Sequence, residues 1–263
     1  GWVAFSAYVI GVLAIIVSGI MLKKFKMFAG EPAPFVMELP AYHTPTLVNV
    51  LRSMWERGWS FIKKAGTIIL LSTILVWFTT YFGFVDGSFR MLAEDQIDHS
   101  ILAAIGGAIA WIFAPLGWGN WQAAVASITG LVAKENIVST MGILYGGSGT
   151  IYTNLAATFT TISGYSFLVF NLLCAPCFAA IGAIKREMNN AKWTGFAIGY
   201  QCGFAYAIAL LVNQLGNLFT GNCSTVGGVI GVIVALVFVF LIVFMLVKPY
   251  RESERLTKEV CVK

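Results

Sequence analysis

Residues 172–187 read LLCAPCFAAIGAIKRE, an apolar run with two cysteines, a proline between them and a charged end. If the run is helical, Cys174 and Cys177 are i and i+3, so both thiols project from one face. Pro176 removes a backbone N–H group and frees carbonyl oxygens in the preceding turn. Soft thiols beside free carbonyls favour contact with a transition-metal ion in passage. The alternative is that both cysteines are small packing residues.

The amino-acid composition indicates a membrane protein. Hydrophobic residues make up 58% of the 263 positions and charged residues 11%, with a mean hydropathy of +0.81. Soluble domains carry about 25% charged residues. We therefore expect an all-α polytopic membrane protein with about six to seven membrane segments, which include a re-entrant or broken hairpin. One cytoplasmic, interfacial amphipathic helix is expected in addition.

Apolar runs alternate with short charged segments, and this alternation predicts the domains. Residues 1–64 hold the first span, a proline-rich segment at 31–45 and an amphipathic helix with Thr44 as its N-cap and Pro45 as its first residue. A transmembrane bundle follows over residues 65–247, and residues 248–263 form a cytoplasmic tail. The runs expected to cross or enter the membrane are residues 2–22, 65–84, 101–114, 119–145, 165–184, 193–215 and 226–247.

Basic residues and cysteines limit the orientation and the partners. Fifteen of the seventeen Lys and Arg residues fall in segments that this layout places in the cytoplasm, which predicts a cytoplasmic C-terminus. Since the net charge of +5 lies in short patches between apolar runs, we expect no nucleic-acid partner. Five cysteines, three of them inside apolar runs, do not indicate structural disulfides. The start at Gly1 suggests a piece of a longer polypeptide.

Residues 101–114 form an apolar run of 14 residues, which is short for a full span. The sequence PLGWGN at 115–120 breaks this run without any charged residue, whereas a loop that reached the cytoplasm would usually carry Lys or Arg. We therefore predict a hairpin whose tip, at Pro115, stops inside the protein. Transporters place substrate sites at broken helices of this kind.

Two ionisable residues, Lys134 and Glu135, lie within the apolar run 119–145. Ionisable groups at membrane depth indicate function. If the run is one helix, these neighbours point about 100° apart and do not pair with each other. Glu135 then faces an aqueous cation path while Lys134 anchors the fold, or each residue forms an ion pair with another helix.

Three other segments carry weaker signals. Residues 146–164 are rich in Gly, Ser and Thr and are expected outside the membrane. Glycines 195, 199 and 203 form a stripe that predicts a close approach of two helices. The loop 85–100 is either a solvated acidic loop or, if helical, a cation site built from the i, i+4 pairs Glu94–Asp98 and Asp95–His99.

The chain resembles the C-terminal half of the membrane region of FeoB, the bacterial ferrous iron transporter family. The resembling segments cover most of the chain in the family's order. Two of them resemble the second Gate repeat, and the proline-rich stretch with its helix resembles the central connecting module. The segments are PFVMELPAYHTPTL (34–47), FIKKAGTIIL (61–70), APLGWG (114–119), GLVAKENIVSTMGILYG (130–146) and CAPCFAAIGAIKRE (174–187).

The resemblance implies uptake of Fe2+, as transported substrate, across the bacterial inner membrane, with no bound cofactor. It implies that Cys174 and Cys177 contact the metal. The residues expected on the transport path or at its gate are Lys134, Glu135, Asn136, Pro115 and Pro176.

The implied partners are the lipid bilayer, a regulatory GTP-binding domain, the first Gate half, a small cytoplasmic accessory protein and a second copy of the chain. Because no GxxxxGK[ST] motif occurs here, we expect the GTP-binding domain to lie outside this chain.

Two other functions stay open. Gate repeats are described as similar to nucleoside-recognition domains, so a carrier of nucleosides or other polar solutes is the first alternative. A structural membrane module for a cytoplasmic GTPase is the second. It predicts that replacing Cys174 or Glu135 leaves metal flux unchanged, while deleting residues 47–64 abolishes activity. No HExxH motif, GxSxG motif or His cluster occurs, so we expect no enzyme.

Overall fold

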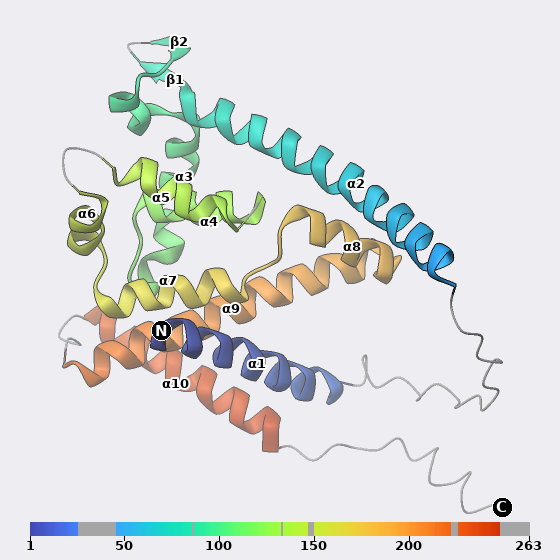
Figure 1. Cartoon of the computed structure of the whole chain (residues 1–263). Coiled ribbons are helices and arrows are strands. Elements are labelled where there is room, and N and C mark those ends of the chain that lie inside the picture. Colours follow the sequence, from blue (N-terminus) through green and yellow to red (C-terminus); the bar gives the residue numbers. More distant parts are fainter. Residues whose placement is uncertain (26–45, 86, 133, 147–149, 222–225, 248–263) are drawn as a thin grey trace, which may run out of the picture.

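The computed structural model describes residues 1–25, 46–85, 87–132, 134–146, 150–221 and 226–247. Over these residues it is mostly helical, in agreement with the expected all-α membrane protein (Figure 1). The whole of the proline-rich segment 31–45 and of the predicted tail 248–263 lies outside the described residues. The elements are α1 (Trp2–Lys23), α2 (Leu47–Tyr81), β1 (Phe82–Val85), β2 (Ser88–Met91), the 3-10 helix η1 (Glu94–His99), α3 (Ile101–Phe113), the 3-10 helix η2 (Ala114–Leu116), α4 (Trp121–Val132), α5 (Asn136–Leu144), α6 (Ile151–Thr158), α7 (Thr161–Leu173), α8 (Phe178–Met188), α9 (Ala191–Phe219) and α10 (Val226–Val247).

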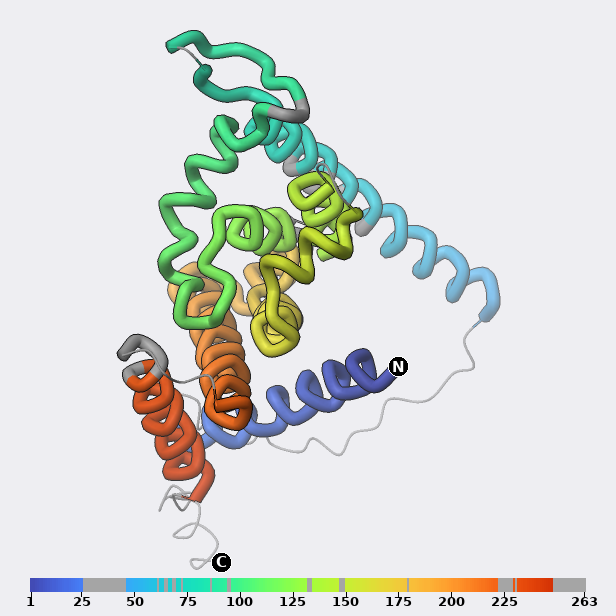
Figure 2. Tube along the Cα trace, turned by 90° about the vertical axis from the view of Figure 1, so that its left-hand side faces the viewer, coloured from blue at the N-terminus to red at the C-terminus, as the bar shows by residue number. Residues whose placement is uncertain are grey.

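Helices α7 and α9 form the centre of the molecule. Helices α1 and α10 lie on one side of this pair, and α3, α4 and α5 lie on the other (Figures 1 and 2). Ala205 and Ala209 of α9 are fully buried, and Ser166 Oγ of α7 donates a hydrogen bond of 2.9 Å to the Ala209 carbonyl. Such small residues let two helices pack closely, which compensates for the weak hydrophobic drive between helices in lipid.

The predicted packing role of the glycine stripe on α9 is wrong for the described part of the chain. A Cβ atom built at Gly195, Gly199 or Gly203 meets no atom within 4 Å. Close approaches occur at other glycines, among them Gly216 of α9, where a Cβ would meet Ile162 at 2.6 Å, and Gly231 of α10, where one would meet Gln214 at 2.5 Å. The spacing of glycines in the sequence therefore did not identify the glycine of α9 that packs closely against another helix.

The broken hairpin predicted at residues 101–120 is present. Helix α3 ends at Phe113, and Gly117 then takes the left-handed conformation, with φ of 87°. The Asn120 side chain caps α4 by accepting a 2.7 Å hydrogen bond from the backbone N–H of Ala123. The two helical arms meet at an angle of 99°. Leu116 and Trp118, at the tip, are 0% and 1% exposed, so the tip is buried in protein.

Two segments predicted as continuous helices are broken. The run 119–145 divides into α4 and α5, with a turn at residues 134–135, and the run 165–184 divides into α7 and α8 at residues 174–177. The segment 146–164 contains α6, which bends by 97° into α7, rather than only an irregular loop. The breaks that the hydropathy pattern missed are short, and the helices on either side of each are mostly apolar.

Helix α2 is one continuous helix, with no break between the interfacial helix and the span predicted on either side of residue 65. A small antiparallel β-hairpin follows it, in which Phe82 pairs with Met91 and Val85 with Ser88. The hairpin packs back on the helix through aromatic rings, with 4.6 Å between the centroids of Phe78 and Phe82. This hairpin is a short exception to the all-α expectation.

The possible cation site in the acidic loop has no support. Residues 94–99 form a 3-10 helix, in which side chains align every three residues, so the assumed i, i+4 pairs do not stand one above the other. The side chains of Glu94 and Asp95 are outside the described set. Within the described ranges, no group of three or more His, Cys, Asp or Glu residues could hold a metal ion.

Among the described residues, two helices are long and apolar enough to cross a membrane, namely α1 and α9. The number rises to four if each of the bent pairs, α3–α4 and α6–α7, counts as one span. A shorter apolar segment covers Gly231–Val247 of α10.

The contact between α3 and α4 can be tested at two adjacent glycines. A Cβ at Gly106 would lie 2.5 Å from Val125 Cγ2 and 2.9 Å from the Trp121 carbonyl oxygen, whereas one at Gly107 meets nothing within 4 Å. We expect Gly106→Ala to lower the free energy of unfolding by ~1–3 kcal/mol relative to Gly107→Ala. Both substitutions gain the same helix propensity, about 1 kcal/mol, so the difference reports the clash. Equal thermal stability of the two variants in detergent would contradict this packing.

Candidate functional site

The two helix breaks lie side by side. Lys134, in the turn between α4 and α5, reaches the end of α7, where its Nζ donates hydrogen bonds to the carbonyl oxygens of Asn171 (2.9 Å) and Leu172 (3.2 Å). These oxygens belong to the last turn of α7, just before Cys174. A lysine at a helix C-terminus also interacts favourably with the helix dipole. Lys134 thus links residues 133–135 to residues 174–177.

Pro176 explains why the Leu172 carbonyl has no helical partner, and the Asn171 carbonyl lacks one because α7 ends at Leu173. In a continuous helix the Leu172 oxygen would accept a bond from the backbone nitrogen of residue 176, but Pro176 has no N–H group. Cys174 and Cys177 have ψ angles of 165° and 160°, so the chain is extended on both sides of Ala175-Pro176. Helix α7 accordingly ends at Leu173, before Pro176. The freed oxygens, however, are occupied by the Lys134 ammonium group.

The two cysteines of the CAPC segment do not share a helix face, so that part of the prediction is wrong. Cys174 ends α7 and Cys177 precedes α8, with extended backbone between them. Cys174 is 9% exposed, and its Sγ lies 3.7 Å from Sγ of Cys202 in α9. The sequence analysis did not predict this contact between Cys174 and Cys202. The sequence did carry one signal for Cys202, namely its position as a third cysteine inside an apolar run.

The sequence suggested that Lys134 and Glu135 are buried inside a helix, but the structure shows that they are not. Both side chains are exposed in the described chain, and Glu135 is the residue that precedes α5. Asn136 is the first residue of α5 and is half-buried. Neither Lys134 nor Glu135 forms an ion pair with another described residue, whereas Arg52 and Glu56 of α2 form one. The interhelical ion pairs considered from the sequence are therefore absent from the described part of the chain.

Pro115 lies at the second point where a helix ends inside the protein. Its carbonyl oxygen accepts hydrogen bonds from Asn213 Nδ2 (3.1 Å) and Gln214 Nε2 (2.7 Å), and the Tyr206 hydroxyl donates to the Ile112 carbonyl at 2.7 Å. All three donors come from α9 and none is charged. Sequence analysis missed them, although Asn213-Gln214 stands out as a polar pair in the apolar run 193–215.

The hairpin tip and the cysteine break share one core. Trp118 stacks on Phe113 with 4.4 Å between ring centroids and lies 5.4 Å from the ring of Phe170, in the last turn of α7. Cys174 and Leu116 belong to the same buried cluster. A displacement of the tip would therefore be transmitted to the cysteine break through these close-packed side chains.

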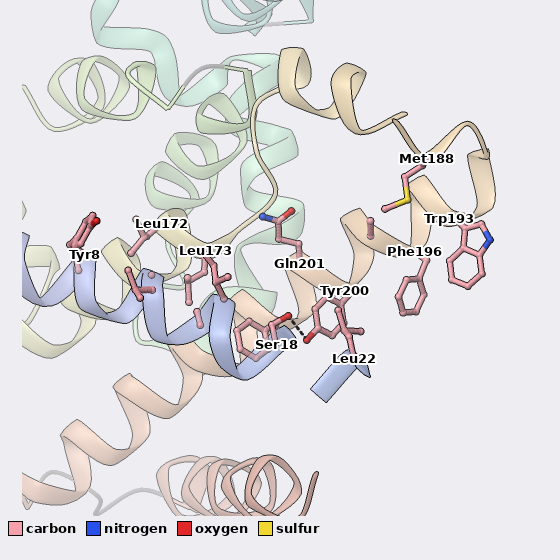
Figure 3. Close-up of a pocket in the computed structure, with 17 residues that line it drawn as sticks. Tyr8, Ser18, Leu22, Leu172, Leu173, Met188, Trp193, Phe196, Tyr200 and Gln201 are labelled. Atoms are coloured by element: carbon pink, nitrogen blue, oxygen red, sulfur yellow. Dashed lines mark hydrogen bonds between the residues drawn. The ribbon is translucent and has the colours of Figure 1, made fainter. Parts of the chain in front are cut away.

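A cleft of about 920 Å³ lies between α1 and α9 (Figure 3). Leu172 and Leu173, next to the cysteine break, form part of its wall, and the Tyr200 hydroxyl lies 2.8 Å from Ser18 Oγ across it. Most of the lining is apolar, so the cleft offers few ligands for a cation. The polar and sulfur groups described above lie at the helix breaks instead.

The comparisons with known proteins agree on one family. Residues 4–57 match the family model described as the C terminus of ferrous iron transport protein B, and residues 62–191 match the model named Gate and described as nucleoside recognition. The chain is 37% identical over 221 residues to the Fe(2+) transporter FeoB of Methanocaldococcus jannaschii, and 34% identical over 219 residues to that of Staphylococcus aureus. It is 30% identical over 263 residues to an Fe(2+) transport protein A/Fe(2+) transporter FeoB fusion protein of Porphyromonas gingivalis.

These relatives are longer than the chain. The alignments cover 83%, 82% and 83% of the chain but only 33%, 32% and 31% of the three relatives, so the chain spans about a third of their length. No solved structure matches the chain.

The link between the two breaks can be tested at Lys134. We expect Lys134→Met to lower thermal stability, by an amount on the order of 1 kcal/mol, because two carbonyls lose an exposed charged donor. Cys174 should also react faster with a thiol-alkylating reagent, because the end of α7 is no longer held.

Lys192→Met is the matched control, since Lys192 is exposed and its side chain makes no hydrogen bond or ion pair with the part of the chain that is described. If both variants leave stability and the Cys174 reaction rate unchanged, the Lys134 contact does not hold the break.

Proposed function

The chain belongs to the FeoB family, as part of its C-terminal membrane region, and we propose that it forms part of the membrane path of an Fe2+ uptake transporter. The observation that carries this proposal is the buried thiol of Cys174 at a helix break inside the membrane region. Helix breaks expose polar backbone groups at membrane depth and are the sites where transporters bind ions. Sulfur is a ligand type that favours transition metals over Mg2+ and Ca2+.

An ion that leaves water needs ligands within the protein, because an unpaired charge in an apolar core is very costly. Cys174 is the proposed first ligand, and Cys177, half-buried three residues later, is a second contact. A site with only a few ligands suits a transported ion, because the ion must bind strongly enough to enter and weakly enough to leave. Fe2+ is therefore the substrate of the path, and no resident cofactor is proposed.

The remaining residues of the site are proposed to control passage. Lys134 holds the end of α7 through two carbonyls, so its release would free backbone oxygens next to Cys174. Glu135 and Asn136 offer oxygen ligands at the same break. Pro176 keeps the break open by removing a donor, and Pro115 does the same for the buried hairpin tip.

The wider assembly is also a proposal. In the complete transporter, a GTP-binding domain would regulate passage, and the first Gate half would supply the facing wall of the path. The fusion relative, whose name joins Fe(2+) transport protein A to FeoB, supports a small cytoplasmic accessory partner. We further propose a multi-pass location in the bacterial inner membrane, with a cytoplasmic C-terminus, a surrounding lipid bilayer and self-association.

One observation favours a second candidate function. The matched Gate model carries the description of nucleoside recognition, which suggests a carrier of nucleosides. Competition separates the two functions. Excess unlabelled nucleoside would reduce uptake by a nucleoside carrier but not by an iron transporter, whereas excess Mn2+ or Co2+ would reduce only iron uptake.

The decisive experiment is uptake of radioactive Fe2+ by iron-starved cells that express the transporter with Cys174→Ser and Cys177→Ser together. We expect uptake to fall at least about tenfold, as for the loss of groups around a metal. Membrane levels of the protein are matched by immunoblotting. Cys261→Ser, in the C-terminal segment, is the chemically matched control and should leave uptake unchanged.

Normal uptake by the double variant would remove both thiols from the path and leave Glu135 and the hairpin tip as candidates. If uptake is normal in that variant but lost on deletion of residues 47–64, the chain acts as a structural module.

A further inference from the structure

We propose that an anionic phospholipid occupies the cleft between α1 and α9, with an acyl chain along its apolar walls and its phosphate group beside Lys23 and Lys185. This inference goes beyond the transport function and does not rest on it. It assigns a ligand to the cleft of about 920 Å³, which the proposed iron path does not use. The lipid would form part of the contact between α1 and α9.

The first argument is the position of the cleft. Its walls, α1 and α9, are the two described single helices that are long and apolar enough to cross a membrane, so the cleft between them faces hydrocarbon chains. It extends along α1 from Ala7 to Leu22, which is ~22 Å at about 1.5 Å per residue. This length exceeds half of a hydrocarbon core of ~30 Å, so an acyl chain of one leaflet can lie along it.

The second argument is the chemistry and size of the cleft. Most of its lining is apolar, and none of the described side chains that line it carries a charge. The hydroxyl groups of Ser18 and Tyr200 hydrogen-bond each other at 2.8 Å, so each has a partner when a hydrocarbon chain lies against it (Figure 3).

The volume of the cleft favours a lipid over a helix. A volume of about 920 Å³ is in the range of small-molecule sites. A helix ~10 Å across would need ~1,700 Å³ over the same length of ~22 Å. A lipid chain therefore fits the cleft better than a helix from another segment or from a second copy.

The third argument is the positive charge at one end of the cleft. Lys23 follows the lining residue Leu22 directly, and Lys185 lies three residues before the lining residue Met188, on the same face of α8. Trp193 lines the same end (Figure 3). Tryptophan is typical of the level of lipid headgroups, and lysines there attract anionic lipids. The acidic Glu187 lies ~100° around α8 from Met188, and thus away from the cleft.

The test uses the photoreactive residue p-benzoylphenylalanine in place of Phe204, which lines the cleft, or of Phe240, which is 67% exposed on α10. The complete transporter is reconstituted in vesicles of phosphatidylglycerol and phosphatidylethanolamine in equal amounts, extracted in mild detergent and irradiated. We expect mass spectrometry to find phospholipid attached at position 204. Position 240 is the matched control and should carry only detergent, which replaces lipid on an open surface.

Other occupants of the cleft would give other products. A cross-link from position 204 to another segment of the transporter, or to a second copy of it, would overturn the proposal. Attachment of detergent alone at position 204 would overturn it as well.

Two pairs of variants test the acyl-chain and headgroup contacts separately. Ala14→Trp fills the cleft and should reduce the phospholipid product at position 204 several-fold, whereas Leu13→Trp, on the exposed face of α1, should retain it. Equal yields from these two variants would contradict binding in the cleft. Thermal unfolding of both variants in detergent confirms that they fold.

Lys23→Gln combined with Lys185→Gln should lower the ratio of phosphatidylglycerol to phosphatidylethanolamine in the product, by about fivefold for each charge removed. Arg57→Gln combined with Lys63→Gln, two exposed residues of α2 that do not line the cleft, is the matched control. An unchanged ratio in the first pair would overturn the assignment of an anionic lipid.

Discussion

The contact between Lys134 and the end of α7 is the constraint on which the candidate site depends. A helix that ends inside a membrane protein leaves carbonyl oxygens without donors, and in an apolar medium each is costly. Pro176 creates this problem for Leu172, and the Lys134 ammonium group solves it from another helix break. The two breaks therefore stabilise each other. Cys174 is held at the point where they meet.

The same constraint appears where α3 ends, and there it is satisfied without charge. Tyr206, Asn213 and Gln214 donate to the carbonyls of Ile112 and Pro115. These donors and Cys202 all lie on α9, which is continuous through its 29 residues. One unbroken helix thus donates hydrogen bonds to the end of a broken one. Irregular backbone can exist within a membrane region where it is buried in protein in this way.

The arrangement separates apolar and polar functions in space. The cleft between α1 and α9 has mostly hydrocarbon walls, whereas sulfur, amide and ammonium groups gather at the helix breaks (Figure 3). In the proposed function, an ion would therefore find sulfur and oxygen ligands at the helix breaks rather than along this cleft. Trp118 and Phe170 pack against each other between the hairpin tip and the cysteine break, and so connect the two. Since packed cores transmit displacement, this contact gives the tip a mechanical connection to Cys174.

The sequence by itself determined the membrane class, the helical character, the buried break at Pro115, the loss of a donor at Pro176 and the family motifs. Each follows from local properties, namely hydropathy, charge and the missing N–H group of proline. Only the tertiary structure decided the break at residues 133–135, the exposure of Glu135, the continuity of α2 and the pairing of Cys174 with Cys202. The partner of a free carbonyl or a thiol is supplied by a residue distant in the chain. Local pattern therefore predicts where a partner is needed, and packing decides which residue provides it.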